Sequence, residues 1–570
     1  MNVNESYARW AAAELEDADL SAEIAAINGS ENEIYERFYT DLVFGTGGLR
    51  GILGAGSNRM NIYVVRRATQ GICDWLKSGN RKLSAAVSYD SRIKSDLFAK
   101  ETAAVFAANG IKVYLYKSLA PTPLLSWAIR YYGCGTGVMI TASHNPSEYN
   151  GYKAYDENGC QLTDGDSADI LARVNSLDIF SGAAKTDFDK AVADGMIEYV
   201  SEEALEEYYK SILDCRCDKE ALKESDLKIA FTPLNGTGNT FVRRILDEIG
   251  AKNVCLTECQ LEPDGNFPTC PYPNPEMPKA LEEGIKTAKD NGCDLLIATD
   301  PDADRLGVAS KNGDDYVLLT GNEVGALMAE YIAEYRTRTG TMPKDPVMVK
   351  TVVTTKLADS VAKNYNVEVR DVLTGFKYIG DQIFRLEKQG CENRFIFGFE
   401  QSCGYLAGSY IREKDAVASA MLIAEMAANY KRQGKTLYDA VQDLYNKYGY
   451  YYTGEDNFTF AGADGMKKMA SIMDGLFAAP PAEFNGEKVV CRCDYRAGVR
   501  TEGEVNEKID LPSSDVLSLQ LESGNYVIVR PSGTEPKLKV YYMVIGENLE
   551  DALEMTAKLK EEARKLLGIA

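Results

Sequence analysis

The chain has 570 residues, of which 45% are hydrophobic and 26% charged, and its formal net charge at pH 7 is −22. A chain of this length exceeds what one hydrophobic core organises, so we expect roughly four domains of an ordinary soluble globular protein. The negative charge argues against binding to nucleic acid and to anionic membrane surfaces. A phosphorylated substrate would therefore need a site that is locally positive.

The thirteen cysteines include no CxxC pair, and His144 is the only histidine, which argues against a zinc site. A disulfide framework does not suit so large a core-rich chain. The N-terminus has neither a basic nor an apolar signal region, and the longest apolar stretch, 416–428, is interrupted by Glu425 and too short to span a bilayer. We expect a cytoplasmic protein with reduced thiols, no membrane contact and no evident obligate protein partner.

Along the chain, a loose apolar stripe predicts helix across 8–40, and a glycine-rich loop follows at 44–51. Alternating strands and helices come next, with strands at 85–87 and 113–116 and helices at 96–108 and 124–132. The apolar run 138–140 predicts a buried strand that leads into Ser143. Asn145-Pro146 and Asn150-Gly151 predict turns.

The strand and helix alternation occurs twice more. The second series has strands at 227–231, 254–256 and 295–299 with helices at 240–249 and 278–289. The third has strands at 347–353, 367–372 and 395–399 with helices at 356–365 and 378–389. Three such series predict an α/β protein with three similar α/β domains and mixed, mainly parallel sheets.

The last part of the chain has a different pattern. After helices near 416–448, strands are expected around 489–493, 526–529 and 538–544, and a final helix at 548–567. This pattern predicts a smaller C-terminal α+β domain. We expect four domains packed as one body around a central cleft, with the boundaries 1–212, 213–314, 315–448 and 449–570.

Ser143 is the most informative serine, because α/β units bind ligands beyond the carboxyl ends of their strands. An exposed hydroxyl at the end of a strand can act as a nucleophile or as a phosphoryl carrier. The alternative is a turn whose side chains satisfy only local backbone groups.

The segment after the strand 295–299 reads Asp-Pro-Asp-Ala-Asp-Arg. Asp300, Asp302 and Asp304 alternate, so in an extended backbone all three would point to one side. Three neighbouring carboxylates repel each other unless a divalent cation holds them, and oxygen ligands favour Mg²⁺. An EF-hand does not fit, because Arg305 stands where the turn glycine belongs and Lys311 where the bidentate glutamate belongs. A solvated acidic turn is the remaining alternative.

Two further polar loops follow expected strands. Glu400 and Ser402 have the chemistry to bind vicinal hydroxyls, although the pair alone is typical of a protein surface. The segment 530–537 combines an arginine, two hydroxyls and a glycine, which suits a phosphate cradle but also a polar hairpin turn.

Together these segments resemble a known family. The sequence has TASHNP at 141–146 with NGYK at 150–153, DPDADR at 300–305, GFEQS at 398–402 and RPSGTEPK at 530–537. The glycine-arginine loop 44–51 and LTGFK at 373–377 complete the set. In this order and over the full length, the chain resembles the α-D-phosphohexomutase superfamily, in its phosphoglucomutase/phosphomannomutase branch.

The resemblance implies an isomerase that interconverts glucose 1-phosphate and glucose 6-phosphate, and also acts on mannose phosphates, through a phosphoserine and a hexose bisphosphate. It implies a hexose monophosphate substrate, Mg²⁺, and a hexose 1,6-bisphosphate activator. The implied catalytic residues are Ser143, His144, Lys153 and Arg50, with Lys153 as general acid/base. The implied metal ligands are Ser143, Asp300, Asp302 and Asp304. The implied substrate-binding residues are Arg305, Thr374, Gly375, Lys377, Glu400, Ser402, Arg412, Lys414, Arg530, Ser532, Gly533 and Thr534.

The segment after Glu400 departs from the best-known glucose-specific members. It reads Gln-Ser-Cys-Gly-Tyr, which leans toward the branch with phosphopentomutases and bisphosphate synthases, so phosphomannomutase or phosphopentomutase stays open as the main activity. A phosphatase that uses a serine nucleophile would need similar residues but would transfer the phosphate to water. A non-catalytic sugar-phosphate sensor would be favoured had Ser143 or an aspartate been lost, and none is.

Overall fold

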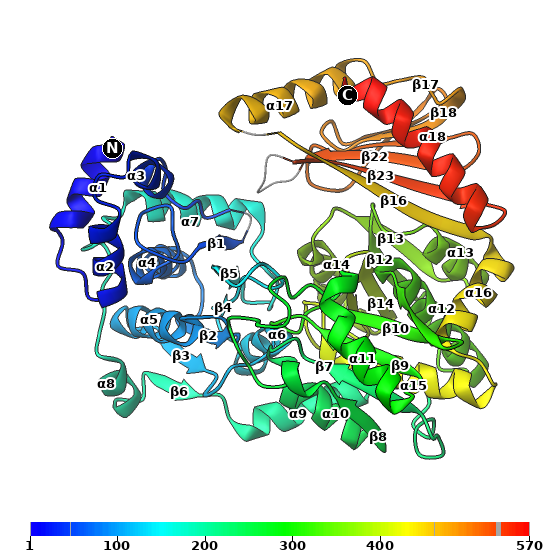
Figure 1. Ribbon diagram of the computed structural model, residues 1–570, viewed down its shortest axis with the longest axis horizontal. Helices are drawn as coiled ribbons and strands as arrows, with labels where there is room; N and C mark the ends of the chain where they lie inside the picture. The colour runs from blue at the N-terminus through cyan, green and yellow to red at the C-terminus, as the bar shows by residue number, and fades with distance from the viewer. Residues whose placement is uncertain (1, 46, 461, 532–536, 569–570) are drawn as a thin grey trace.

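The computed structural model describes residues 2–45, 47–460, 462–531 and 537–568. Four sheets with their helices make up the molecule (Figure 1). The first unit, blue to cyan, lies on the left of the view, and the green second and third units lie beside it. The fourth unit, orange to red, lies above the third and carries the C-terminus.

The first unit holds a six-stranded sheet in the order β1-β5-β4-β2-β3-β6, in which only β5 runs antiparallel to the other strands. Its strands are β1 Gly48–Ile52, β2 Ser84–Tyr89, β3 Lys112–Leu115, β4 Thr136–Ile140, β5 Tyr149–Tyr155 and β6 Ile197–Tyr199. Its helices are α1 Val3–Ala12, α2 Ala18–Ala26, α3 Glu31–Phe38, α4 Ile62–Ser78, α5 Ser95–Ala108, α6 Thr122–Tyr132, α7 Asp164–Ser176, α8 Phe188–Ala193 and α9 Glu202–Leu213.

Two local predictions in this unit are wrong. The expected helix 8–40 is three helices, because Asp17 caps α2 with its side chain and Gly29 takes a left-handed φ of 85° before α3. Asn150-Gly151 is not a turn but part of β5. The Asn150 side chain bonds to Ile93 O and Ser95 Oγ, and Gly151 lies so close to Thr141 O that a Cβ would come within 2.4 Å of it.

The second and third units repeat a parallel core with antiparallel edge strands, in the orders β11-β10-β9-β7-β8 and β13-β12-β14-β15. The second contains β7 Lys228–Thr232, α10 Gly238–Glu248, β8 Asn253–Leu256, η1 Glu258–Gln260, η2 Pro278–Leu281, α11 Glu282–Asn291, β9 Leu295–Thr299, β10 Leu306–Asn312 and β11 Asp315–Leu319. The third contains α12 Gly321–Thr339, β12 Val347–Thr351, α13 Leu357–Asn364, β13 Glu368–Val372, α14 Phe376–Lys388, η3 Glu392–Arg394, β14 Phe395–Glu400, β15 Gly404–Leu406, α15 Ala416–Arg432 and α16 Leu437–Tyr448.

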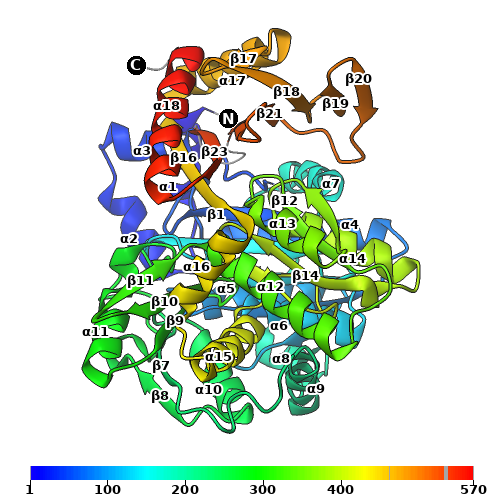
Figure 2. The ribbon, with the colours of Figure 1, turned by 90° about the vertical axis from the view of Figure 1, so that its right-hand side faces the viewer.

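The fourth unit is an antiparallel sheet in the order β16-β23-β22-β21-β18-β19-β20, with β17 paired to β18. Figure 2 shows the hairpin of β19 and β20 extending from the rest of this sheet. Its elements are β16 Tyr450–Thr459, α17 Gly462–Ala478, β17 Glu483–Phe484, β18 Glu487–Asp494, β19 Val499–Glu502, β20 Val505–Lys508, β21 Leu517–Leu521, β22 Tyr526–Pro531, β23 Lys537–Gly546 and α18 Leu549–Leu567.

The predicted fold class is confirmed: three α/β units with mixed, mainly parallel sheets precede a C-terminal α+β unit. One hydrophobic core runs through the first three units, with Met139, Ile297 and Phe399 among its buried members. Because these residues lie on β4, β9 and β14, the shared core fixes the loops that follow those strands. The domain boundaries stay a prediction. Among the described helices, none is long and apolar enough to cross a membrane.

Candidate active site

The loop after β4 turns sharply at Ser143, which has a left-handed φ of 52°. Its Oγ donates a hydrogen bond to Asp300 Oδ2 at 2.8 Å and lies 3.1 Å from His144 Nδ1. The expectation of an exposed hydroxyl is wrong, because the residue is only 3% exposed. Packing against the second unit covers Ser143 and brings it to the aspartates.

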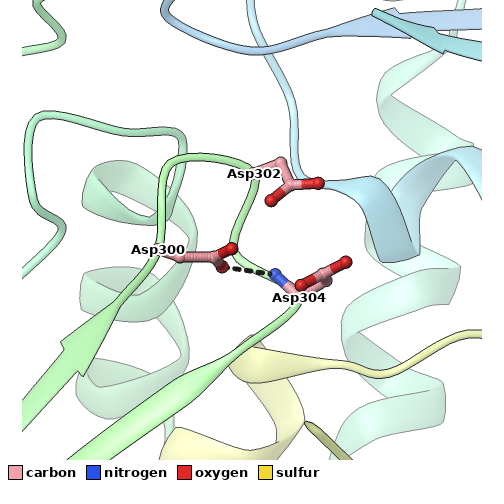
Figure 3. Close-up of side chains that lie close together, drawn as sticks. All are labelled: Asp300, Asp302 and Asp304. Atoms are coloured by element: carbon pink, nitrogen blue, oxygen red, sulfur yellow. Dashed lines mark hydrogen bonds between the residues drawn. The ribbon is translucent and has the colours of Figure 1, made fainter. Parts of the chain in front are cut away.

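Asp300, Asp302 and Asp304 are buried between β9 and β10, and one carboxylate oxygen from each lies within 4.8 Å of the others (Figure 3). The expected extended backbone is wrong, because Ala303 takes a left-handed φ of 48° and the chain turns. Asp300 Oδ1 accepts hydrogen bonds from the backbone N of Asp304 and Arg305 at 3.1 and 3.0 Å. The turn, rather than strand alternation, gathers the three carboxylates.

Two lysines neutralise part of this charge. Lys153 Nζ, on β5, lies 2.8 Å from Asp302 Oδ2 and 3.3 Å from Asp304 Oδ2, and Lys414 Nζ lies 3.2 Å from Asp304 Oδ2. Thr122 Oγ1 also donates to Asp302 Oδ2, at 2.7 Å. The site therefore combines residues of the first three units.

The donor set fits a hard cation. Asp302 Oδ1 and Asp304 Oδ1 are buried and have no hydrogen-bond partner, although buried carboxylate oxygens normally have one. Oxygen atoms that converge in this way are the ligands that Mg²⁺ prefers. The buried triad can thus bind a metal ion.

Burial and charge separate the pKa values in this site. Burial, followed by the charges of Asp302 and Asp304, raises the pKa of Asp300 well above its usual range. Burial would also raise the pKa of Asp302, but Lys153 and neighbouring hydrogen bonds lower it instead. Burial would lower the pKa of Lys153, but Asp302 and Asp304 raise it, so the ammonium stays charged.

His144 and Arg50 also contact the serine loop, through Ser143 Oγ and Asn145 Oδ1. Burial and the positive charges of Arg305 and Arg50 lower the pKa of His144 well below its usual value, which keeps the imidazole neutral. Arg50 Nη1 donates to Asn145 Oδ1 at 3.4 Å. Arg305 is paired with Glu276, a partner that the sequence did not point to.

The third unit contributes Glu400, at the end of β14. Gly375, at the N-terminus of α14, donates its backbone N–H to Glu400 Oε1 at 3.0 Å. Burial raises the pKa of Glu400, while Lys414 and Arg305 lower it. Thr374 Oγ1 is buried without a hydrogen-bond partner, and Ser402 lies in the turn between β14 and β15.

Two predicted substrate-binding residues have other partners. Arg412 is 1% exposed, and its guanidinium binds Glu387 Oε2 at 2.6 Å and the backbone O of Ser409 and Ile411. Lys377 Nζ binds Asp164 Oδ1 at 2.7 Å. Neither has a described contact with the aspartate triad, so the structure does not bring these two residues to it.

Arg530 lies at the end of β22, on the fourth unit. Burial raises the pKa of Tyr378 of α14 and of Tyr541 of β23 to about 12, while the positive charge of Arg530 lowers the pKa of both phenols. Tyr378 of the third unit packs in one apolar cluster with Tyr541 of the fourth, so Arg530 lies near the contact between these two units. Ser532, Gly533 and Thr534 lie outside the described residues.

The sequence analysis missed Arg92, Thr122 and Glu276, which surround the site. Arg92 follows the strand β2 in the segment Asp90-Ser91-Arg92. A charged segment directly after a buried strand was the available signal, by the same reasoning that drew attention to Ser143 and Asp300.

Comparison with known proteins agrees with this arrangement. Models of α/β/α domains I, II and III of phosphoglucomutase/phosphomannomutase match residues 41–179, 206–313 and 320–448. A phosphoglucomutase of Staphylococcus haemolyticus is 35% identical, over 92% of this chain and 95% of the relative. One of Staphylococcus epidermidis is 36% identical, over 92% and 96%.

Solved structures share the fold. The open form of pp63/parafusin, a phosphoglucomutase from Paramecium, has a TM-score of 0.68 at 18% identity, covering 93% of this chain and 96% of the other. A phosphoglucomutase/phosphomannomutase family protein from Burkholderia thailandensis has a TM-score of 0.65 at 16% identity, covering 92% and 98%. Fold and site define an α/β enzyme that isomerises its substrate by phosphoryl transfer. The chain belongs to the phosphoglucomutase/phosphomannomutase family.

Proposed function

We propose that this enzyme interconverts glucose 1-phosphate and glucose 6-phosphate, with Ser143 as the phosphoryl carrier and glucose 1,6-bisphosphate as the intermediate. The observation that carries the proposal is the 2.8 Å hydrogen bond from Ser143 Oγ to Asp300 at the edge of a buried aspartate triad. The name phosphoglucomutase, given to relatives at about a third identity, supports glucose as the main sugar.

In the first half-reaction, the bond from phosphorus to Ser143 Oγ breaks while a bond forms to a hydroxyl of the hexose monophosphate. The hydroxyl proton passes to a neighbouring base. The bisphosphate then turns over. Ser143 Oγ takes the other phosphoryl group as the bond from that phosphorus to the sugar oxygen breaks, and the sugar oxygen takes up a proton. Lys153 is the best-placed group to return a proton, because its ammonium stays charged beside Asp302.

Asp300, Asp302, Asp304 and an oxygen of phosphorylated Ser143 would hold a Mg²⁺ ion. When bound, this ion neutralises charge on the transferring group, which is the main requirement in phosphoryl transfer. The neutral His144 beside Ser143 Oγ orients that atom. Arg50 lies near enough to contribute positive charge to the same loop.

The third and fourth units supply the binding groups in this proposal. Glu400, held by Gly375, and Ser402 bind the sugar O3 and O4 hydroxyls, which a turned-over sugar presents again. Arg530 with the segment 532–534 holds the phosphate that is not being transferred. Arg305, Thr374, Lys377 and Lys414 complete the pocket. Because no group in this set binds O2, we propose that mannose phosphates also react.

A substrate panel tests the proposal: kcat/KM for glucose 1-, mannose 1-, ribose 1- and N-acetylglucosamine 1-phosphate, with Mg²⁺ and a hexose 1,6-bisphosphate activator. Glucose is expected to lead mannose by about 1–3 kcal/mol, since a site that does not bind a hydroxyl discriminates weakly against its epimer. Discrimination beyond about 10⁴-fold would mean that a group binds O2. Ribose 1-phosphate ahead of both hexoses would indicate a phosphopentomutase, and net release of phosphate would indicate a phosphatase.

A further inference from the structure

Arg92 lies directly beneath the Ser143 loop and has no part in the chemistry described above. It follows β2 in the connection to α5, and its side chain is fully buried. Burying a guanidinium costs free energy unless its charge is paired and its donors are hydrogen-bonded, so the partners of Arg92 indicate what it does.

All four hydrogens on the two terminal nitrogens of Arg92 have acceptors in one loop. Nη1 donates to the carbonyl oxygens of Pro146 and Tyr149 at 2.8 and 2.9 Å. Nη2 donates to Ser143 O at 2.6 Å and to Asn145 O. A planar guanidinium is the only side chain with enough donors in a fixed fork for such a set.

The remaining donor of Arg92 faces a second buried charge. Nε lies 3.5 Å from Asp90 Oδ2, while Asp90 Oδ1 accepts from the Arg92 backbone N at 3.0 Å and from Ser95 Oγ at 2.8 Å. Asp90 therefore fixes the start of the segment. The two terminal nitrogens of the guanidinium therefore bind the four carbonyl oxygens of the serine loop, which would repel each other without this positive charge.

Residues of the second unit pack against Arg92 and the segment that carries it. The ring of Phe267, itself fully buried, lies 5.1 Å from Arg92 Cζ. A Cβ on Gly265 would come within 2.5 Å of the backbone N of Ile93, so this loop rests directly on the segment that carries Arg92. The same unit supplies Asp300, the partner of Ser143 Oγ.

We infer that Arg92 is the positioning residue that holds the Ser143 loop in its turned conformation and aims Oγ at the aspartate triad. A left-handed conformation at a non-glycine residue such as Ser143 persists only where the surroundings determine it, and the guanidinium supplies four of those constraints. The inference rests on the proposed role of Ser143. It assigns Arg92 to phosphoryl transfer rather than to substrate binding, because its described contacts reach only the loop, Asp90 and the second unit.

The geometry predicts how substitutions behave. Arg92→Met keeps the volume but removes charge and donors, and Arg92→Lys keeps the charge but offers three donors from one point. Because a displacement of about 1 Å in a reacting group costs about 10²-fold, kcat should fall about 10²-fold or more in Arg92→Met. KM for glucose 1-phosphate should change less than about threefold by the same reasoning, and Arg92→Lys should lie in between.

The matched control is Arg216→Met. Arg216 is also largely buried and binds Glu425 at 3.0 Å, but in a contact between the segment after α9 and α15 that does not involve the serine loop. We expect Arg216→Met to lower the melting temperature and to leave kcat per folded molecule within about twofold of wild type, as for a purely structural contact.

Two measurements accompany turnover. Intact mass follows phosphorylation of the dephosphorylated enzyme by glucose 1,6-bisphosphate, and hydrogen exchange compares the amides of 143–149 with those of 300–305. We expect Arg92→Met to slow phosphorylation as strongly as kcat and to raise exchange in 143–149 alone. If Arg92→Met does not fold, the same measurements on Arg92→Lys test the inference.

The outcomes separate this inference from the proposed function. If the wild-type enzyme never carries phosphate on Ser143, the proposed function fails. If the wild type is phosphorylated and a folded Arg92 variant reacts at the wild-type rate, the inference about Arg92 is overturned. A loss of kcat that only matches the unfolded fraction, as in Arg216→Met, overturns it equally.

Discussion

Lys153→Met removes one of the two lysines that help to balance the charge of the aspartate triad. Lys153 Nζ lies 2.8 Å from Asp302 and 3.3 Å from Asp304, and Lys414 reaches only Asp304. Losing one partner of a buried charge pair costs about 3–5 kcal/mol, because the remaining carboxylate is left uncompensated. We therefore expect the variant to lose about this much unfolding free energy in buffer with a chelator.

Mg²⁺ should restore part of that loss. A ligand that binds only the folded state stabilises it by RT ln(1 + [L]/Kd), about 2.7 kcal/mol at a hundredfold excess over Kd. With Lys153 gone, the triad is more negative and no ammonium competes for Asp302. We expect Kd for Mg²⁺ to fall about tenfold, so the stabilisation by Mg²⁺ should exceed that of wild type by about 1.4 kcal/mol. Turnover should fall about 10²–10⁴-fold if Lys153 is the general acid.

The assay is urea and thermal unfolding with chelator and with saturating Mg²⁺, together with calorimetric titration of the metal. Lys350→Met is the matched control. Lys350 is fully buried and lies 2.6 Å from Asp371 and 3.0 Å from Asp359, both carboxylates of the third unit. Its loss should destabilise the protein equally with and without Mg²⁺. If Lys153→Met gave the same metal-independent loss, the triad would not be the cation site and the reasoning would be refuted.

Three other predictions follow from the site and its surroundings. Ser143→Ala should abolish nearly all turnover and the phosphate seen by intact mass, yet cost only about 0.5–1.5 kcal/mol of stability, because one hydrogen bond is lost; a variant with near-wild-type activity would contradict the mechanism. Arg530→Ala should raise KM about 10–100-fold, the worth of a charge-assisted contact to phosphate, with a smaller effect on phosphorylation of Ser143. If phosphorylation of Ser143 were lost while KM stayed unchanged, this loop would bind the transferred phosphate rather than the other one, and the assignment would be wrong. Burial raises the pKa of Asp156 to about 6, so the wild type loses stability as pH rises from about 4 through 6, and Asp156→Asn should gain up to about 3 kcal/mol relative to it over that range. A difference in urea unfolding that does not vary with pH would refute this assignment.

The sequence by itself determined the alternation of elements and the places of the polar loops. The buried strands β4, β9 and β14 are short apolar runs, and each was predicted because such runs end at polar or turn-forming residues. The loops with Ser143, Asp300 and Glu400 follow these strands as expected. Local pattern suffices here because the period of a strand and the chemistry of a turn are properties of neighbouring residues.

The local sequence pattern was a less reliable guide where a helix cap or a turn set the backbone conformation. The predicted helix across 8–40 did not anticipate the cap at Asp17 or the left-handed Gly29, and the predicted turn at Asn150-Gly151 is a strand. In β5, Gly151 packs directly against Thr141 O, which only a glycine allows. This packing favours a strand where the dipeptide alone favours a turn. Packing against a neighbour outweighed the local preference.

Only the tertiary structure decided which side chains meet. Ser143 and Asp300 are far apart in the chain, and the hydrogen bond between them exists because the first and second units share one core. The same packing buries Arg92 beneath four carbonyls and turns Arg412 toward Glu387, although both arginines lie in polar segments of the sequence. The direction of a long side chain depends on charges and space supplied by distant segments, and a linear sequence does not record these.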